Sequence, residues 1–593
     1  MRDVVYRNAK VVMSAICVSL ALWLCFFNNI EELIIWVFFF FILFYNKEYQ
    51  DSEIIGRKDF FIYIICSAGI SLAVVLGIKL WEKKQIFDKK VYVIIACIGL
   101  SLIVYTVVKK MFSGLTVQIC EHKLMFLKVK PIVFILLSMA LLMICWLPML
   151  LANYPGIVVS DSEWQWNQAL GVYNLSNHHP VLHTMFIRLA QQICILLCGS
   201  VDANIAVCIY SVMQMAIMAL VISCMMCYLY RQGTFKVLLI IAYLYYAIFP
   251  LQAMFSIYMT KDTLFSVFVF LLVALCERIY FSDGEWIKKP VNCVLVLIDI
   301  FLVTFLRSNG ILVSIAVLLV LGICYRKYFK EFGLILLIIM ICWLAKGKVF
   351  SVYNVGEANI VESLGMPINQ IGNIVVKEKS LTDEETALIE NVLSLEDIKE
   401  AYSPYYSDPI KFHGNFNSEA ISNNKGEYFK LWIRLFFKYP RTCLEASLNL
   451  TIGYWYPGVP KGAISYNIPE KNRFLEGIGA KPHGILFHDD MYDYFLGTDV
   501  RDNPILSWLF SIGDAVIFMF MLCFFSVSKI GWKATTVFLP NIIVWLTMLV
   551  ATPSYCETRY VYSIFITLPF YLNFVCYGLK LKFSSNSEGE RVN

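Results

Sequence analysis

The sequence is short of charge. Only 16% of its 593 residues are Asp, Glu, Lys or Arg, whereas soluble globular proteins carry about 25%. The 49 basic and 44 acidic residues nearly cancel and leave a formal net charge of +5, which is too small to favour a nucleic-acid partner. The chain also lacks a P-loop, a Rossmann glycine motif and a serine nucleophile elbow. It therefore gives no support for soluble-nucleotide or serine-hydrolase chemistry.

Long apolar runs are what the sequence does have. Hydrophobic residues make up 59% of the chain, and the mean hydropathy is +0.67. The runs are long enough to cross a bilayer as helices. The sequence therefore predicts an all-α polytopic membrane protein with about 14 transmembrane helices. The predicted helices cover residues 11–27, 31–46, 60–80, 91–108, 131–151, 204–230, 235–256, 263–280, 291–306, 309–325, 333–350, 505–527, 534–551 and 560–578.

The orientation of these helices follows from the basic loops, which favour the cytoplasmic side. The parity depends on residues 181–199, where Arg188, Gln191 and Gln192 interrupt an apolar run. This pattern is typical of an amphipathic helix that lies in the membrane interface. If this run does not cross the membrane, all basic loops after it fall on the cytoplasmic side. The basic loop 81–90, which precedes the run, falls outside and is the one exception. We therefore expect a multi-pass protein of the cell membrane with both termini in the cytoplasm.

Four regions follow from this topology. Residues 1–130 form an N-terminal membrane region of four helices. Residues 131–350 form a transmembrane core that carries an external loop at 152–203. Residues 351–504 form an extracytoplasmic α-rich domain, in which the segment from Thr382 to Glu385 reads as a capping box that opens a helix. Residues 505–593 supply the last membrane helices and a cytoplasmic tail.

The first external loop concentrates polar residues beside the membrane. Ionisable groups are costly there and therefore suggest function, although a solvated aromatic belt would contain similar residues. Asp161 is the strongest candidate, because it lies where a helix ends and a tryptophan-rich segment begins. The candidates in this loop are Asp161, Glu163, Trp164, Trp166, His178, His179 and His183.

Three further polar clusters fall on the same predicted side, at residues 258–262, 307–310 and 557–560. Each has a simple structural alternative. Asp262 could cap a helix, and Arg307 could place its head group at the membrane surface without binding anything. Four clusters on one side are nevertheless more informative than any one of them. The candidates in these three clusters are Lys261, Asp262, Arg307, Asn309, Glu557, Arg559 and Tyr560.

A metal site has little support in the sequence. His179 and His183 are spaced four residues apart. Pro180, however, begins the predicted helix, so His179 precedes it, and the glutamate of a His-Glu-x-x-His motif is not present. We therefore expect no cofactor, and a divalent metal is not needed for the chemistry considered below.

Together these clusters resemble the GT-C superfamily of glycosyltransferases that use polyprenyl-phosphate sugars. The chain is similar to the protein O-mannosyltransferases and to the aminoarabinose transferases that act on lipid A. Asp161 matches the acidic residue of the first external loop of the core. His179-Pro-Val-Leu182 matches the motif that opens an interfacial jaw helix. Asp262 matches a second acidic residue by position.

The later motifs match less closely. Arg307 resembles an arginine of a later loop, and Arg559-Tyr560 resembles an Arg-Tyr element in a late helix. Residue 181 is Val where the family motif has a second proline, and four extra helices precede the core. The resemblance covers residues 131–350 well and the rest loosely, and the subfamily looks bacterial.

The resemblance implies transfer of a sugar from a polyprenyl-phosphate donor to an extracytoplasmic acceptor, which could be a cell-wall polymer, a glycolipid or a protein. Asp161 is then expected to act as the general base, and fixed cations would stabilise the phosphate that leaves. Trp164 and Trp166 could stack on a sugar. The expected catalytic residues are Asp161, Asp262 and His179. The expected substrate-binding residues are Glu163, Trp164, Trp166, His178, His183, Lys261, Arg307, Asn309, Glu557, Arg559 and Tyr560.

Other functions stay open at this point. A transporter or flippase of lipid-linked glycans would use the same groove and the same cations without chemistry. Asp299 and Asp514 lie within apolar runs, as a proton-coupled carrier would require. A polymerase or ligase would differ only in using a lipid-linked oligosaccharide as donor. In every case the partners are membrane lipids and lipid-linked glycans.

Overall fold

The computed structural model describes residues 13, 16, 19, 56–81, 90–120, 129–459, 473–481, 485, 486 and 509–589. The helices predicted at 11–27 and 31–46 therefore lie outside the described residues, apart from three single positions. The loop at 82–89 lies outside them as well. All statements below concern the described part of the chain.

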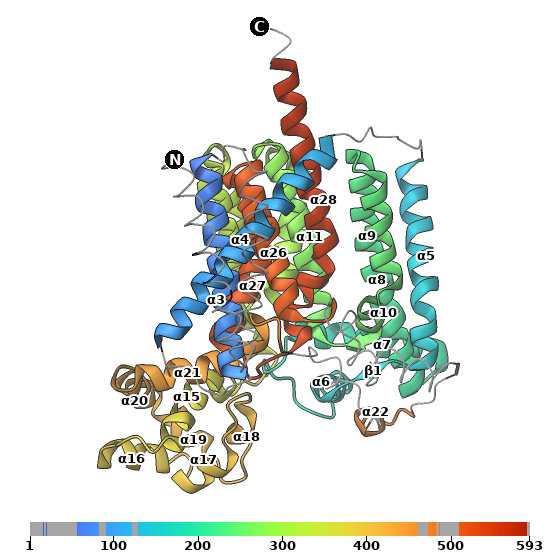
Figure 1. Ribbon diagram of the computed structural model, residues 1–593. Helices are drawn as coiled ribbons and strands as arrows, with labels where there is room; N and C mark the ends of the chain where they lie inside the picture. The colour runs from blue at the N-terminus through green and yellow to red at the C-terminus, as the bar shows by residue number, and fades with distance from the viewer. Residues whose placement is uncertain are drawn as a thin grey trace.

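Ten helices in this part are long and apolar enough to cross a membrane. They confirm that the chain is an all-α polytopic membrane protein (Figure 1). These helices are α3 (Arg57–Trp81), α4 (Lys90–Cys120), α5 (Pro131–Ala152), α7 (Val181–Cys198), α8 (Ala203–Gln232), α11 (Lys261–Phe281), α14 (Phe329–Val352), α26 (Ile512–Lys529), α27 (Thr535–Ala551) and α28 (Thr558–Gly589).

Four shorter apolar helices complete the bundle. The helices α9 (Lys236–Ile248) and α10 (Pro250–Ile257) are bent by 49° at the break between them, and together they would form an eleventh span. The bend falls before Pro250, which cannot donate a backbone hydrogen bond. The helices α12 (Pro290–Leu306) and α13 (Gly310–Cys324) are apolar but shorter than the ten candidates.

Two short strands tie distant parts of the bundle together. The strand β1 (Ile157–Val158) follows α5, and β2 (Tyr258–Met259) lies between α10 and α11. They pair in parallel, with Ile157 opposite Tyr258 and Val158 opposite Met259. The ends of α5 and α10 therefore meet at one end of the bundle, which we call the β1 end (Figure 1).

The strand pairing also bears on the path of the chain around α7. Between β1 and β2 the chain leaves the β1 end through α8 and returns through α9 and α10, which are two crossings. A third crossing by α7 would place β2 at the opposite end, away from its partner. Length and composition alone would allow α7 to span, but it lies at the β1 end beside α6 (Ser160–Leu170) (Figure 1).

A small helical domain also lies at the β1 end (Figure 1). We call residues 360–454 the α15–α21 domain. The capping box predicted at Thr382 and Glu385 is present, with each side chain bonded to the other residue's backbone N–H. The helices and 3-10 turns of this domain are η3 (Ile360–Leu364), α15 (Gly365–Val376), α16 (Asp383–Glu390), α17 (Leu395–Ala401), α18 (Asp408–Lys411), α19 (Ser418–Asn423), α20 (Lys425–Lys438), α21 (Pro440–Leu450) and η4 (Ile452–Tyr454).

The remaining described elements are short and lie between the longer helices. The helix α22 (Arg473–Gly477) packs against α6 and β1. The 3-10 turns η1 (Glu285–Lys288), η2 (Arg326–Tyr328) and η6 (Trp532–Ala534) join successive helices at the end of the bundle opposite the β1 end. Each of these turns carries at least one basic residue, and η2 carries two.

The tight reversal between α12 and α13 depends on Gly310. A Cβ atom placed there would lie 1.9 Å from the backbone oxygen of Val303. We expect Gly310→Ala to cost about 1–3 kcal/mol of folding free energy, because the backbone of α12 must move. Gly333→Ala is the matched control, since a Cβ on Gly333 in α14 would meet nothing within 4 Å. Thermal unfolding of the two purified variants measures the difference, and equal stability would contradict the prediction.

Candidate functional site

The position of Asp161 follows from the way α6 begins. Asp161 occupies the first turn of α6, where the partial positive charge of a helix N-terminus favours a carboxylate. The neighbouring Ser162 hydroxyl donates a hydrogen bond to the carbonyl of Met259 in β2. Because α11 begins two residues after Met259, this bond and the β1–β2 pairing bring the first turns of α6 and α11 together.

Asp161 lies beside two cationic side chains, and a histidine contacts one of them. Its Oδ2 atom is 2.8 Å from Nζ of Lys261 and 3.3 Å from Nη1 of Arg559. The same Lys261 Nζ is 3.1 Å from Nδ1 of His179. We call these four residues the Asp161 cluster. The Asp161 side chain keeps 25% of its surface exposed, so the carboxylate is held by the protein and still open to solvent.

Partial burial and the neighbouring charges act on the pKa values of the Asp161 cluster. Burial alone would raise the pKa of Asp161, but Lys261 and Arg559 hold it well below its usual range. Burial, reinforced by the Lys261 charge, lowers the pKa of His179 to about 3. His179 is therefore neutral at neutral pH, and its Nδ1 accepts a hydrogen bond from the Lys261 ammonium.

The low pKa of His179 makes folding depend on pH. An unfolded histidine has a pKa of about 6.5, so the folded state resists taking up this proton. The stability is fully present above about pH 6.5 and is lost as the pH falls toward 3. Between pH 7.5 and pH 5 the loss from His179 is expected to be about 2 kcal/mol. Asp161 adds nothing in this interval, because its pKa is already below it.

The measurement is thermal unfolding of the wild type and of His179→Gln at both pH values. The variant is expected to lose less stability on acidification than the wild type. His413→Gln is the matched control, because His413 lies in the α15–α21 domain and away from the cluster. An equal acid sensitivity of the wild type and His179→Gln would show that His179 is not held neutral.

Arg559 enters the cluster from the start of α28. Its Nε atom is 3.4 Å from Oε1 of Glu557, and its Nη2 atom is 3.2 Å from the Tyr560 hydroxyl. The backbone of α28 leaves helical geometry at Val561, with φ −126° and ψ 17°. The first turn of α28 therefore carries its own carboxylate, guanidinium and phenol to the site, just before a kink.

Asp262 and Arg307 form a second ion pair behind the first. The Nε atom of Arg307 is 3.2 Å from Oδ1 of Asp262, and its Nη1 donates to the Tyr560 carbonyl at 3.0 Å. The guanidinium also lies 4.7 Å from the centre of the Tyr560 ring. Asp262 is fully buried and bonded to the Thr260 hydroxyl. Asp262 therefore holds Arg307 in place, and a catalytic role for Asp262 stays a prediction.

Two more predicted contact residues are buried. His183 has no exposed surface, and its ring nitrogens lie 2.8 Å from Gln165 Oε1 and 2.7 Å from the Tyr210 hydroxyl. Trp166 is 1% exposed within an apolar cluster. These two side chains pack α6 against α7 and α8 and so support Asp161. Their contact with a substrate stays a prediction.

The other predicted residues lie near the site without joining the Asp161 cluster. Trp164 is exposed and packs on the Tyr173 ring, with 4.7 Å between the ring centres. His178 is exposed and lies against His179. Asn309 donates to the Thr547 hydroxyl at 2.8 Å. The Glu163 carboxylate lies against Gly477 of α22, and no described contact joins it to Asp161.

Tyr258 is a site residue that sequence reasoning missed. It is buried, and its hydroxyl makes no hydrogen bond with any described residue. Burial raises the pKa of Tyr258 well above its usual value, and Arg559, Glu557 and Asp161 all act on it electrostatically. Its hydroxyl therefore stays protonated beside the Asp161 cluster. The available signal is its place in the 258–262 cluster, where Lys261 and Asp262 are the charged residues.

Metal ligands are not gathered in the described part of the chain. No group of three or more His, Cys, Asp or Glu side chains there is placed to hold a metal ion. His179 and His183 begin the same helix but have different partners, because Lys261 faces the first and Gln165 and Tyr210 face the second.

Fold and site together define an α-helical membrane protein with a network of ion pairs at one end of its helices. The chain belongs to a family of unknown function (DUF6020), whose model matches residues 166–582. The matched region contains Lys261, Arg307 and Arg559 and begins five residues after Asp161. No curated protein and no solved structure matches the chain.

Proposed function

We propose that the protein is a membrane glycosyltransferase of the GT-C type. It moves a sugar from a polyprenyl-phosphate carrier to an acceptor outside the cytoplasm, which is a cell-wall polymer, a glycolipid or a protein. The single observation that carries this proposal is the contact of one partly exposed carboxylate, Asp161, with two cations, Lys261 and Arg559. An acid beside fixed positive charge suits an attack that releases a phosphate.

The proposed orientation rests on the basic residues at the two ends of the bundle. The end opposite the β1 end carries basic residues in η1, η2 and η6. The positive-inside rule then places that end in the cytoplasm and the Asp161 cluster outside. We also propose that the full set contains about 14 transmembrane helices, with both termini cytoplasmic, and that α7 acts as the interfacial jaw helix.

The cations would bind the donor and stabilise its leaving group. As the bond between the anomeric carbon and the phosphate oxygen breaks, a phosphodiester becomes a monoester and gains negative charge. Lys261 and Arg559 are placed to receive this charge at the surface of the bundle. Arg307 lies near them, but its charge is balanced by the buried carboxylate of Asp262. The lipid tail of the donor would lie between membrane helices.

Donor binding would also make Asp161 a better base. While Asp161 pairs with both cations, its pKa lies well below the usual range, and so weak a base takes a proton poorly. A donor phosphate competes for Lys261 and Arg559, which weakens their hold on the carboxylate and lets its pKa rise. The acceptor hydroxyl then gives its proton to Asp161 as it attacks the anomeric carbon, with inversion there.

A reconstitution experiment tests the proposal. The protein is placed in vesicles with polyprenyl-phosphate sugars labelled in the sugar and with a cell-envelope fraction as acceptor. Transfer releases the lipid phosphate and moves the label to a water-soluble or lipid acceptor. Movement of intact labelled donor across the membrane, without release of lipid phosphate, would replace the proposal by transport. A ladder of products would indicate a polymerase that uses longer donors.

Transport is the second candidate because of one buried acid. Asp299 in α12 is 1% exposed, and neither of its carboxylate oxygens has a hydrogen-bond partner among the described residues. Acids buried in spans often take part in proton-coupled carriers. Asp299→Asn separates the two functions, since it should abolish proton-coupled uptake and leave sugar transfer intact.

A further inference from the structure

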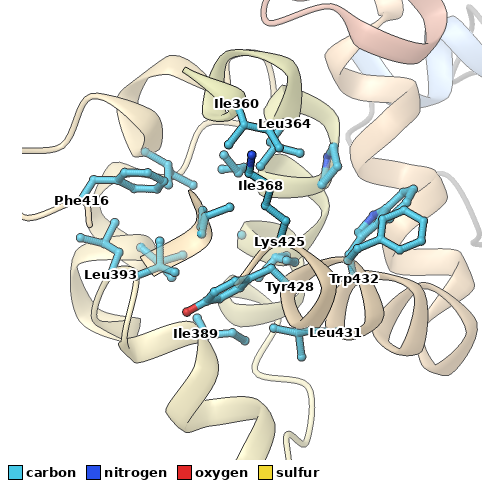
Figure 2. A pocket seen from close by; sticks show the side chains of 18 of the residues that line it. Ile360, Leu364, Ile368, Ile389, Leu393, Phe416, Lys425, Tyr428, Leu431 and Trp432 are labelled. Carbon is cyan, nitrogen blue, oxygen red and sulfur yellow. The ribbon is translucent and has the colours of Figure 1, made fainter. Parts of the chain in front are cut away.

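A large cavity lies inside the α15–α21 domain. Its volume is about 500 Å³, and its walls come from η3, α15, α16, α17, α18, α19 and α20 (Figure 2). The walls are almost entirely apolar, and Lys425 is the one charged residue among those that line it. Residues of the wall include Ile368, Ile371, Leu393, Phe416, Leu431 and Trp432.

The size of this cavity argues against an ordinary packing defect. The cost of an empty apolar cavity rises with its volume. An engineered apolar cavity of about 150 Å³ already stays dry and takes up benzene, and this one is more than three times as large. Leu393 and Leu431 belong at the same time to the core of the domain, so the cavity replaces part of that core. A domain of this size is better served by an apolar ligand that fills the space.

Lys425 indicates the kind of head group that such a ligand carries. It is the first residue of α20 and is exposed, and its ammonium has no ion-pair or hydrogen-bond partner among the described residues. Its side chain reaches over the cavity from the start of the helix (Figure 2). An anion at this position would neutralise Lys425 while the rest of the molecule lies between isoleucine and leucine side chains.

The surface of α20 indicates that the ligand comes from a membrane. Phe429, which lines the cavity, is 60% exposed, and Phe437 is 75% exposed. The same helix carries basic side chains, as helices that lie on membranes do. The next helix, α21, contacts the spanning helix α3, so the α20 surface lies close to the bundle (Figure 1).

We propose that the α15–α21 domain binds an anionic membrane lipid. A hydrocarbon chain of the lipid occupies the cavity, and its head group pairs with Lys425. This site is separate from the Asp161 cluster, and the inference holds whether or not the protein transfers sugar.

Photocrosslinking of the full-length protein in phosphatidylcholine nanodiscs tests the proposal. The probe is phosphatidylglycerol with a diazirine in one acyl chain, and a phosphatidylcholine with the same chain is its uncharged-head counterpart. After illumination, crosslinked peptides are mapped by mass spectrometry. Labelling is expected on peptides that line the cavity, and the anionic probe should label them more than the zwitterionic one.

Matched variants assign the label to the cavity. Ile368→Trp and Ile371→Trp fill the space and are expected to remove the label. Lys425→Glu is expected to lower labelling by the anionic probe about tenfold and to leave labelling by the zwitterionic probe unchanged. Lys430→Glu makes the same charge change on α20 outside the lining and should behave as wild type.

Three results would overturn the proposal. The first is labelling confined to the membrane helices. The second is undiminished labelling in both tryptophan variants. The third is an equal effect of Lys425→Glu and Lys430→Glu on the anionic probe. Both tryptophan variants replace partly exposed wall residues, and a thermal unfolding curve like that of the wild type shows that each is folded.

Discussion

Replacing Asp161 by Asn is expected to lower sugar transfer by about 10²–10⁴-fold, the usual contribution of a general base. The amide keeps the shape of the side chain but cannot accept the proton of the acceptor hydroxyl. Binding of the donor should not weaken, because Lys261 and Arg559 lose a competing carboxylate. The expected signature is therefore a large fall in kcat with little rise in KM for the donor, measured in the reconstituted assay.

The controls separate catalysis from folding. Glu476→Gln removes an exposed carboxylate from α22, which packs against α6, and should retain full activity. Asp161→Glu restores the charge on a longer side chain and should recover part of the rate. If Asp161→Asn is folded and transfers sugar at the wild-type rate, Asp161 is not the base, and the Asp161 cluster has a structural or binding role only.

Arg559→Gln is expected to lower transfer by about 10²–10³-fold, the typical loss when one donor to a developing anion is removed. Arg559 contacts Asp161 directly and lies beside Glu557. Its loss leaves Lys261 as the only described cation in contact with Asp161. Because the phosphate carries charge before and after reaction, both KM for the donor and kcat should change, unlike the result for Asp161→Asn. Steady-state kinetics with varied donor measure the two constants.

A double variant tests whether the two residues act together. If Arg559 both binds phosphate and restrains Asp161, the two substitutions should not act independently. The loss of transition-state free energy in the double variant Asp161→Asn/Arg559→Gln should be smaller than the sum of the losses in the two single variants. Arg434→Gln removes an exposed arginine from α20 and serves as the control for loss of positive charge. Activity of Arg559→Gln equal to that of Arg434→Gln would remove Arg559 from the mechanism.

Much of the membrane architecture could be predicted from sequence, because apolar runs report directly on helices that lie in lipid. The predicted run at 131–151 matches α5 (Pro131–Ala152), and the run at 534–551 matches α27 (Thr535–Ala551). The surface position of residues 181–199 came from three polar side chains and a parity argument. That position stays a prediction. The strand pairing itself could not be predicted from any apolar pattern, because each strand has only two residues.

For the candidate site, the sequence could predict which segments come close together but not which side chains contact one another. All four polar clusters lie at the β1 end, yet the direction of each side chain could not be read from the sequence. Lys261 and Asp262 are adjacent, but the first turns to Asp161 and the second turns inward to Arg307. His179 and His183 likewise begin one helix with different surroundings. Direction depends on helical rotation and on packing partners that lie far away in the chain.

The cavity of the α15–α21 domain lay beyond sequence reasoning for a different reason. Its isoleucine and leucine residues are those that any core would contain. Whether such residues meet or leave a space depends on how the short helices pack, which is a property of three dimensions. Lys425 gives no signal either, since a lysine at the start of an amphipathic helix is common on surfaces.

The parallel strand pair restricts how the site can move. The pairing of Ile157 with Tyr258 and the bond from Ser162 to Met259 fix the start of α6 against the start of α11. Asp161 and Lys261 are therefore held at one relative position. Arg559 comes from a separate helix that bends at Val561. The tip of that helix is therefore the part of the site best able to move. A ligand approaching the carboxylate would swing Arg559 aside before it disturbed Lys261.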